Sequence, residues 1–331
     1  MDKIYSHIIG MGYYVPEKVI KNSYFESIMD TSDEWIYERT GIKERRFINN
    51  DEGPSDLAIP AIKMALKNAH LSNDDIDFII FSTSTPDYYI PGSGCLIQEK
   101  MGFDLIGALD IRCQCSGFIY ALSIADQYIQ NGTYSNILVV TSEVQSTAMD
   151  LSNHGRDTSI IFADGAAAAI LSKSNTGGIL STHLHSQGKH VKELWVEAPS
   201  SKVSPRLSPG ILQSRKQFLQ MNGREVFKHA VKRFPEVIKE ALDYNNLSIG
   251  DIDLLIPHQA NVRISKMVQH KLGLNDEQVI SNIHKYGNTT SASIPIALCE
   301  AIMDNKLKKG DILVLAAFGS GFSWGSAILK W

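Results

Sequence analysis

The sequence has few cysteines and no long apolar run. Only four cysteines occur among its 331 residues, and their spacing does not form a disulfide framework, so we expect a reducing, cytoplasmic environment. No apolar run approaches the roughly 18–20 residues that cross a bilayer. The first residues also lack a basic leader followed by an apolar stretch. We therefore expect neither a membrane anchor nor a secretory signal.

The chain also lacks an excess of positive charge. Its net charge is −4, which argues against a nucleic-acid-binding protein. One region departs from this balance, because residues 200–233 contain eight Lys or Arg and a single acidic residue. This segment is either a solvated surface or a docking patch for an acidic partner. It overlaps an irregular stretch, 181–220, that is rich in Ser, Pro and Gln and whose role the sequence leaves open.

The sequence contains an internal repeat. The twenty residues from Ala61 (AIKMALKNAHLSNDDIDFII) match those from Val237 (VIKEALDYNNLSIGDIDLLI) at ten positions, with a constant offset of 176. This offset is close to half the chain length. The sequence therefore predicts two copies of one module, which we divide into an N-terminal half, 1–175, and a C-terminal half, 176–331.

Each copy alternates continuous apolar segments with amphipathic ones. In the first copy we expect strands over 105–111 and 136–143, with a helix over 117–130 between them. Apolar strands that alternate with helices indicate a sheet covered on both faces. We therefore predict a layered α/β fold built from two βαβ-type modules, with mixed, mostly parallel sheets.

Two of the four cysteines, Cys113 and Cys115, lie one residue apart. In a strand, residues i and i+2 are roughly 6.5–7 Å apart at Cα, which is at the limit of what a disulfide spans. No second Cys or His pair completes a zinc site nearby. His183, His185 and His190 form at most a loose set, so we expect no metal.

The position of Cys115 differs from that of Cys113. Cys115 immediately precedes the expected helix that begins at Gly117, whereas Cys113 lies in or near the preceding strand. Unpaired N–H groups at a helix N-terminus favour a thiolate and lower the pKa of a cysteine. We therefore interpret Cys113 as structural. For Cys115 taken alone, an inert core thiol and a nucleophile both remain possible.

Two further polar residues occupy corresponding places in the second copy. His258 follows a buried apolar strand, and Asn288 lies in a glycine-containing turn before a helix. That helix is the counterpart of the helix that follows Cys115. If the two modules pack with pseudo-twofold symmetry, Cys115, His258 and Asn288 will lie close together.

Several motifs together resemble one family. The sequence is similar to the β-ketoacyl-acyl-carrier-protein synthase III family, which has the thiolase fold, over nearly its whole length. The motifs are TSDEWIYERTGIKERR (from Thr31), CSGFIYAL (from Cys115), GRDTSIIFADGAAAAIL (from Gly155), NGREVFKHAV (from Asn222), PHQANVRI (from Pro257), YGNTTSASIP (from Tyr286) and FGSGFSWGSAIL (from Phe318).

The resemblance implies an acyltransferase that condenses an acyl-CoA primer with malonyl-acyl-carrier protein and so initiates fatty acid synthesis. It assigns Cys115 as the acyl-accepting nucleophile, and His258 and Asn288 as the pair that assists decarboxylation. The backbone N–H groups of Cys115 and Ser320 would form the oxyanion hole. Two alternatives stay open: a condensing enzyme of secondary metabolism that uses a longer or unusual acyl-CoA, and a non-catalytic acyl-binding scaffold.

The resemblance also suggests residues for binding. No cofactor is implied, and the expected partners are acyl-CoA, malonyl-acyl-carrier protein and a second copy of the chain in a homodimer. Ile90 would reach across the dimer and line the acyl pocket. The other implied positions are Trp35, Arg39, Thr40 and Arg156 for CoA, and Lys228, Arg263, Arg224 and Lys266 for docking of the carrier protein.

Overall fold

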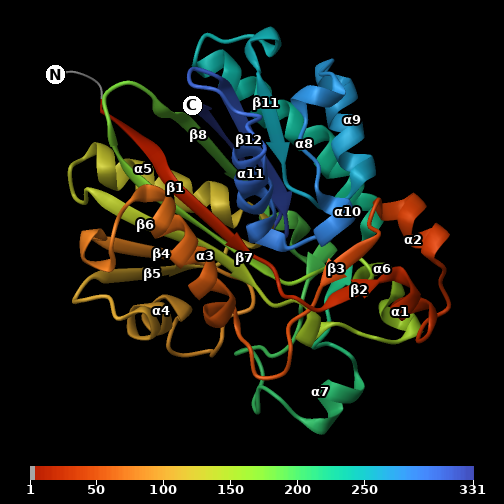
Figure 1. The fold of residues 1–331 in the computed structure, drawn as a ribbon. Helices are drawn as coiled ribbons and strands as arrows, with labels where there is room; N and C mark the ends of the chain where they lie inside the picture. The colour runs from red at the N-terminus through yellow and green to blue at the C-terminus, as the bar shows by residue number, and fades with distance from the viewer. Residues whose placement is uncertain (1–3) are drawn as a thin grey trace.

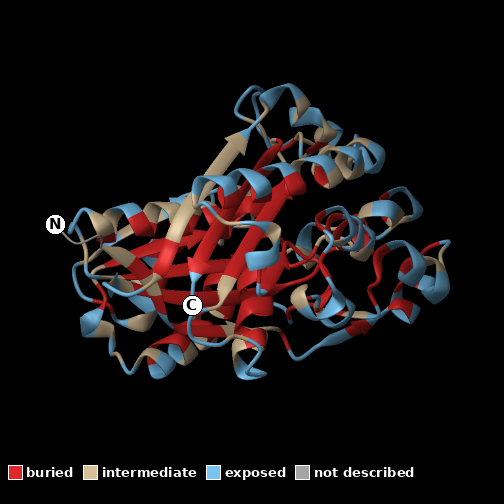
Figure 2. Cartoon of the chain, turned by 90° about the horizontal axis from the view of Figure 1, so that it is seen from above, coloured by how far each residue is buried: buried red, intermediate tan, exposed pale blue. Residues whose placement is uncertain are grey.

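The computed structural model describes residues 4–331 and has five layers (Figure 1). Two β-sheets enclose a central pair of helices, and further helices cover the outer face of each sheet. Figure 2 shows that the strands are mostly buried, whereas the outward faces of the helices are exposed. The fold is therefore the layered α/β architecture that the sequence predicts.

The first sheet has five strands in the order β1-β7-β6-β4-β5. Pairs β6–β4 and β4–β5 are parallel, whereas β1–β7 and β7–β6 are antiparallel. Strand β5 lies at one edge. The bounds are β1 Tyr5–Tyr14, β4 Phe78–Ser82, β5 Gly107–Ile111, β6 Asn136–Glu143 and β7 Gly165–Ser174.

The second sheet has four strands in the order β11-β12-β13-β8. Only its β11–β12 pair is parallel. The mixture of parallel and antiparallel pairs agrees with the sequence analysis, but antiparallel pairs are more frequent than we expected. The bounds are β8 Gly178–Ser186, β11 Leu254–Pro257, β12 Ile312–Gly319 and β13 Ser323–Lys330.

Two helices form the central layer, α5 (Gly117–Gln130) and α11 (Ser293–Met303). Their apolar side chains share one core with residues from both sheets, because α5 is apolar around most of its circumference. Helix α3 (Pro54–Ala69) covers the first sheet, and α8 (Gly223–Tyr244) covers the second. Helix α9 (Val262–Leu272) packs against α8.

The remaining elements are short. Strands β2 and β3 form one ribbon, and β9 and β10 form another. Their bounds, with those of the short helices, are β2 Val19–Lys21, β3 Glu44–Arg46, β9 Leu194–Trp195, β10 Gln220–Met221, α1 Asn22–Glu26, α2 Asp33–Thr40, α4 Ser93–Met101, α6 Arg156–Ser159, α7 Pro209–Gln213 and α10 Ile283–Tyr286. The segment that carries α7 projects from the body (Figure 1). Among the described helices, none has both the length and the apolar character needed to cross a bilayer.

The irregular stretch expected over 181–220 is only partly irregular. Its first residues belong to β8, which pairs with β13 along its whole length. Strand β8 lies at the edge of its sheet, where Ser, Thr and His side chains remain partly exposed, so its sequence lacks the apolar pattern of a central strand. The expected division between 175 and 176 falls between β7 and β8, and it stays a prediction.

Candidate active site

Cys115 lies at the junction between strand β5 and helix α5. It occupies a single 3₁₀ turn, η2 (Gln114–Ser116), directly before the first residue of α5. Gln114 has a φ of 44°, which is unfavourable for a residue other than glycine. Backbone strain of this kind is typical of functional sites. The Cys115 side chain is 6% exposed.

The pKa of Cys115 is shifted upward, whereas its place before a helix would favour a downward shift. Burial and the negative charge of Glu143 raise the pKa of this thiol to about 12. The backbone N–H groups of Cys115 and Ser320 donate to the sulfur and lower the pKa, but by less. Loss of water at this buried position therefore opposes the effect that a helix N-terminus has on the thiol.

The two N–H groups that lower the pKa of Cys115 are the groups predicted to form the oxyanion hole. Ser320 follows the last residue of β12, Gly319, whose position is tightly restricted. A Cβ atom at Gly319 would lie 2.6 Å from Cys115 Cβ and 2.9 Å from its Sγ. The absence of a side chain at this position lets the turn after β12 reach the cysteine. The serine at position 320 does not remove the donor, since a backbone N–H is used.

His258 follows strand β11 and is 2% exposed. Its Nδ1 lies 2.6 Å from Ser293 Oγ, and the Gln259 N–H donates to that same oxygen at 3.2 Å. The serine hydroxyl hydrogen is then free to donate to Nδ1, which places the ring proton on Nε2. Burial lowers the pKa of His258 to about 3, so the ring is neutral. Nε2 has no hydrogen-bond partner within residues 4–331, and it can donate to a ligand.

Asn288 lies between α10 and a second 3₁₀ turn, η8 (Thr290–Ala292). Its side-chain oxygen accepts a hydrogen bond of 2.8 Å from the Thr290 N–H. Its backbone is tied to the first half of the chain through bonds with Ile161 and Ala163. The amide oxygen is thus occupied, and the amide NH₂ group is the part of Asn288 that can donate.

These segments converge. Turn η2 contacts both η8 and β12, and Ser293, the hydrogen-bond partner of His258, directly follows η8. The structure therefore brings the surroundings of Cys115, His258 and Asn288 to one place, as the pseudo-symmetry argument predicts. Their catalytic roles stay predictions. The sequence analysis does not single out Ser293, Thr290 or Glu143. Ser293 and Thr290 lie in the motif that begins at Tyr286, whereas Glu143, at the end of β6, reaches this region only through the fold.

The residues expected to bind CoA lie on α2 and at the start of α6. The guanidinium carbons of Arg39 and Arg156 lie 4.3 Å and 4.9 Å from the centre of the Trp35 ring. Stacking of this kind is a natural use of guanidinium and indole planes. Thr40 differs from the expectation, because it is buried and its hydroxyl donates to the Ile36 carbonyl. We therefore no longer expect Thr40 to contact a nucleotide.

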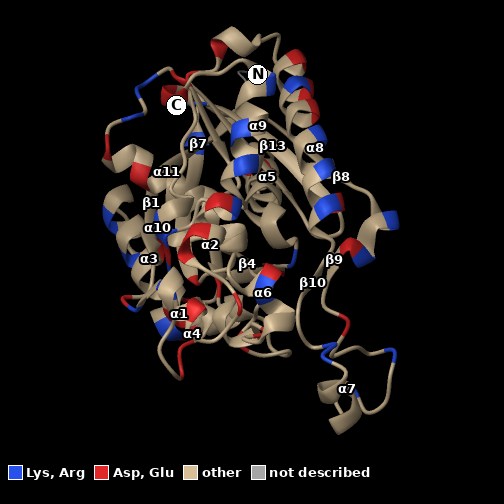
Figure 3. Cartoon of the chain, turned by 90° about the vertical axis from the view of Figure 1, so that its right-hand side faces the viewer, with Lys and Arg blue, Asp and Glu red and all other residues tan. Residues whose placement is uncertain are grey.

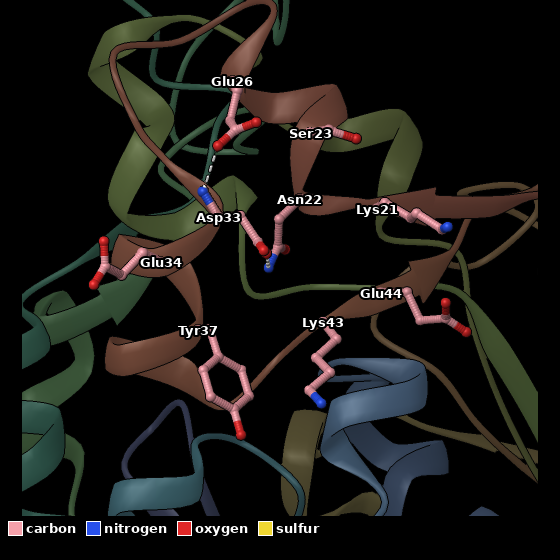
Figure 4. A pocket seen from close by; sticks show the side chains of 9 residues that line it. All are labelled: Lys21, Asn22, Ser23, Glu26, Asp33, Glu34, Tyr37, Lys43 and Glu44. Atoms are coloured by element: carbon pink, nitrogen blue, oxygen red, sulfur yellow. Dashed lines mark hydrogen bonds between the residues drawn. The ribbon is translucent and has the colours of Figure 1, made fainter.

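A hollow of about 550 Å³ lies beside α2, between β2, α1 and β3 (Figure 4). Its wall is polar and carries both signs of charge. It contains none of the residues predicted for the site, and internal bonds such as that from the Asp33 N–H to Glu26 already occupy part of it. The residues are Lys21, Asn22, Ser23, Glu26, Asp33, Glu34, Tyr37, Lys43 and Glu44. We assign it no function.

The four basic residues expected to dock a carrier protein are all exposed. Arg224 and Lys228 lie on α8, and Arg263 and Lys266 lie on the adjacent α9. Figure 3 shows Lys and Arg side by side along both helices.

His183 and His185, the loose set of possible metal ligands, both approach Glu240. In the described chain no cluster of three potential metal ligands is present.

Family models match both halves of the chain. The model of 3-oxoacyl-[acyl-carrier-protein (ACP)] synthase III matches residues 109–188, and the model of its C terminal part matches residues 242–331. A β-ketoacyl-[acyl-carrier-protein] synthase III from Clostridioides difficile is 44% identical over 324 residues, which is 98% of each chain. The chain belongs to the 3-oxoacyl-[acyl-carrier-protein] synthase III family. It is therefore an acyltransferase of the condensing-enzyme type with the thiolase fold.

Solved structures agree with this family. The 3-oxoacyl-[acyl-carrier-protein] synthase III from Aquifex aeolicus has a TM-score of 0.90 and 41% identity, covering 98% of this chain and all of the other. A priming β-ketosynthase from the R1128 polyketide biosynthetic pathway has a TM-score of 0.91 and 31% identity, covering 99% and 97%. This chain is thus also similar to an enzyme of a polyketide biosynthetic pathway.

Proposed function

We propose that this enzyme joins a primer acyl group from acyl-CoA to malonyl-acyl-carrier protein, with loss of carbon dioxide, to give 3-oxoacyl-acyl-carrier protein. This reaction initiates fatty acid synthesis. We favour it over a role in secondary metabolism because curated synthase III relatives are 42–44% identical over at least 98% of this chain, whereas the polyketide enzyme is 31% identical. A cytoplasmic location remains our expectation, supported by the four free cysteines.

The first half-reaction uses Cys115. Its sulfur attacks the thioester carbonyl of acyl-CoA, and the N–H groups of Cys115 and Ser320 stabilise the oxygen of the tetrahedral intermediate. The carbon–sulfur bond to CoA then breaks. Because the thiol is neutral before attack, its proton leaves during this step and ends on the CoA thiol. Arg39, Arg156 and Trp35 would hold the nucleotide end of CoA.

The second half-reaction uses His258 and Asn288. Carbon dioxide leaves the malonyl thioester, and the electron pair of the broken bond forms an enolate. The Nε2–H of His258 and the NH₂ of Asn288 donate to the enolate oxygen in a buried site, where such bonds are strong. The enolate carbon then attacks the acyl-Cys115 carbonyl, and the Cys115 sulfur leaves as a thiolate that takes a proton from the solvent to restore the thiol. No general base is needed, since decarboxylation supplies the carbanion.

The observation that carries this proposal is the state of His258. A ring that is buried, neutral and protonated at an unpartnered Nε2 suits a hydrogen-bond donor and not a general base.

The test follows the acyl group by intact mass. Wild-type enzyme given acyl-CoA should gain one acyl group, and it should release 3-oxoacyl product when malonyl-acyl-carrier protein is added. Cys115→Ala should lose the acyl-enzyme, and the matched variant Cys113→Ala should keep it. Acylation that survives in Cys115→Ala, or no condensation by the wild type, would exclude the proposal.

A further inference from the structure

One buried carboxylate beside the site has no role in the reaction described above. Glu143 is the last residue of β6 and is fully buried. Among residues 4–331 it forms no ion pair with Lys, Arg or His. Burial raises the pKa of Glu143, and a buried carboxyl group without a cation destabilises the fold unless hydrogen bonds compensate. The burial of Glu143 therefore requires a structural or functional explanation.

Glu143 accepts hydrogen bonds from three separate segments. Oε2 accepts from the Ser84 N–H at 3.1 Å, from Ser84 Oγ at 2.6 Å and from Thr85 Oγ1 at 3.2 Å. These residues follow β4. Gln145 Nε2, just beyond β6, donates to the same oxygen at 3.3 Å. Oε1 accepts from Ser291 Oγ, in η8, at 2.6 Å. One side chain thus joins the ends of two strands to a turn of the C-terminal half.

A chain of hydrogen bonds continues from Glu143 to Asn288. Gln145 Nε2 also reaches Thr290 Oγ1 at 3.1 Å, and the Thr290 N–H donates to the Asn288 side chain at 2.8 Å. Thr290 has a φ of 52°, which is strained for a β-branched residue. A strained turn persists only where its surroundings hold it, and here Gln145 and Ser291 connect that turn to Glu143.

Glu143 also influences the surroundings of the nucleophile. A Cβ atom at Gly117, the first residue of α5, would lie 3.1 Å from Ser291 Cβ, so the turn that Glu143 holds packs against the helix of Cys115. The charge of Glu143 contributes to the raised pKa of Cys115. The carboxylate therefore holds the turn beside Asn288 and also acts electrostatically on Cys115.

We propose that Glu143 is a positioning residue for the decarboxylation step, which fixes the Asn288 turn against the half of the chain that carries Cys115. This inference rests on the proposed function, because it concerns how Asn288 presents its NH₂ group to the malonyl thioester. Glu143 accepts no hydrogen bond from Cys115 or Ser320. We therefore expect acyl transfer to Cys115 not to depend on the length of the Glu143 side chain.

Two substitutions separate the effect of the length of the Glu143 side chain from the effect of its charge. Glu143→Asp keeps the charge but is one methylene shorter, so it cannot bond Ser84 and Ser291 together. We expect decarboxylation of malonyl-acyl-carrier protein to fall about 10- to 100-fold, since small displacements of a donor have effects of that size. Acyl transfer from acyl-CoA should stay within about threefold of the wild-type rate.

Glu143→Gln keeps the length of the side chain, so its rate of decarboxylation should fall less than that of Glu143→Asp. Because it removes the negative charge, alkylation of Cys115 should need a lower pH than in the wild type.

Ser291→Ala removes a single bond to Glu143 and serves if Glu143→Asp does not fold. It should show the same selective loss on a smaller scale. Asp126→Asn is the matched control, because Asp126 is a buried carboxyl group on α5 that accepts 2.6 Å from Ser6 Oγ at a distance from the site. It should leave the ratio of the two half-reactions unchanged.

The ratio of the half-reactions decides the outcome. If Glu143→Asp and Ser291→Ala slow both half-reactions equally, or neither, Glu143 does not position Asn288. Failure of the wild type to condense at all would instead exclude the proposed function, so the two failures are distinguishable.

Discussion

At the scale of single residues, burial decides the chemistry of the site. Cys115 directly precedes a helix, yet burial and the charge of Glu143 raise the pKa of its thiol. His258 follows a buried strand, and its neutral state and its tautomer depend on burial and on the hydroxyl group of Ser293. Local sequence can therefore identify the reactive side chains, but their protonation depends on residues that are distant in the chain.

The first prediction concerns the thiol of Cys115. Since its pKa is raised to about 12, the thiolate is scarce at neutral pH, and its fraction grows about tenfold for each unit of pH below that value. In the free enzyme, alkylation of Cys115 by iodoacetamide should therefore rise steadily between pH 8 and pH 10. Peptide mass spectrometry would follow each cysteine separately, with the exposed Cys95 as internal control. A plateau at Cys115 near pH 7 would instead indicate a thiolate stabilised by the helix end.

At the scale of elements, the sequence predicts some bounds well and others poorly. The structure confirms the helix over 117–130 and the strand over 136–143 residue by residue, because the first has apolar residues at helical spacing and the second is a continuous apolar run. Strand β5 begins at Gly107, two residues later than predicted. Strand β8 was missed because its polar side chains follow the edge of a sheet. Pairing partners, and not local pattern, define such strands.

The second prediction tests the close approach of β12 to η2. In Gly319→Ala the new Cβ would lie 2.6 Å from Cys115 Cβ, so one of the two segments must move. The Ser320 N–H would then leave the sulfur, and acyl-enzyme formation should fall about 100-fold, the usual cost of losing one oxyanion donor. Rapid-quench mass spectrometry measures this rate. Gly188→Ala is the control, because nothing lies within 4 Å of its new Cβ, and it should acylate normally. Equal rates in the two variants would contradict the close-contact argument.

The third prediction concerns the basic face formed by Arg224 and Lys228 on α8 with Arg263 and Lys266 on α9. Acyl carrier proteins are acidic, and exposed charges act mainly by steering association in a salt-dependent way. Arg263→Glu should raise the KM for malonyl-acyl-carrier protein several-fold at low salt and leave acyl transfer from acyl-CoA nearly unchanged. Steady-state kinetics at two salt concentrations would show this. Lys63→Glu, on the exposed side of α3, is the control, and an equal effect of both variants would exclude a local docking face.

At the scale of the whole molecule, one edge of the first sheet lacks a partner strand within residues 4–331. Strand β5 lies at the edge of the first sheet, where no described strand of this chain covers its outer side. Large apolar side chains gather on the flanking segments, with Ile90 81% and Leu105 97% exposed. Tyr88 and Tyr89 are exposed beside Ile90. Apolar surface and an open sheet edge together favour association with another copy. We therefore expect a homodimer, which sedimentation equilibrium would test.

The last prediction follows from that dimer and concerns the length of the primer. If Ile90 enters the partner's acyl pocket, an isoleucine there leaves more room than an aromatic ring, so butyryl- and isobutyryl-CoA should be used at least as well as acetyl-CoA. Ile90→Phe should shift the ratio of kcat/KM values toward acetyl-CoA by roughly 10-fold, because one methylene in a pocket changes binding by about 1–3 kcal/mol. Met303→Phe, an exposed position at the end of α11, adds the same ring away from the sheet edge and should leave the ratio unchanged. The dimer and the pocket are tested separately, because Ile90→Phe should still sediment as a dimer. A dimeric Ile90→Phe with an unaltered primer profile would mean that Ile90 covers the interface without limiting the pocket.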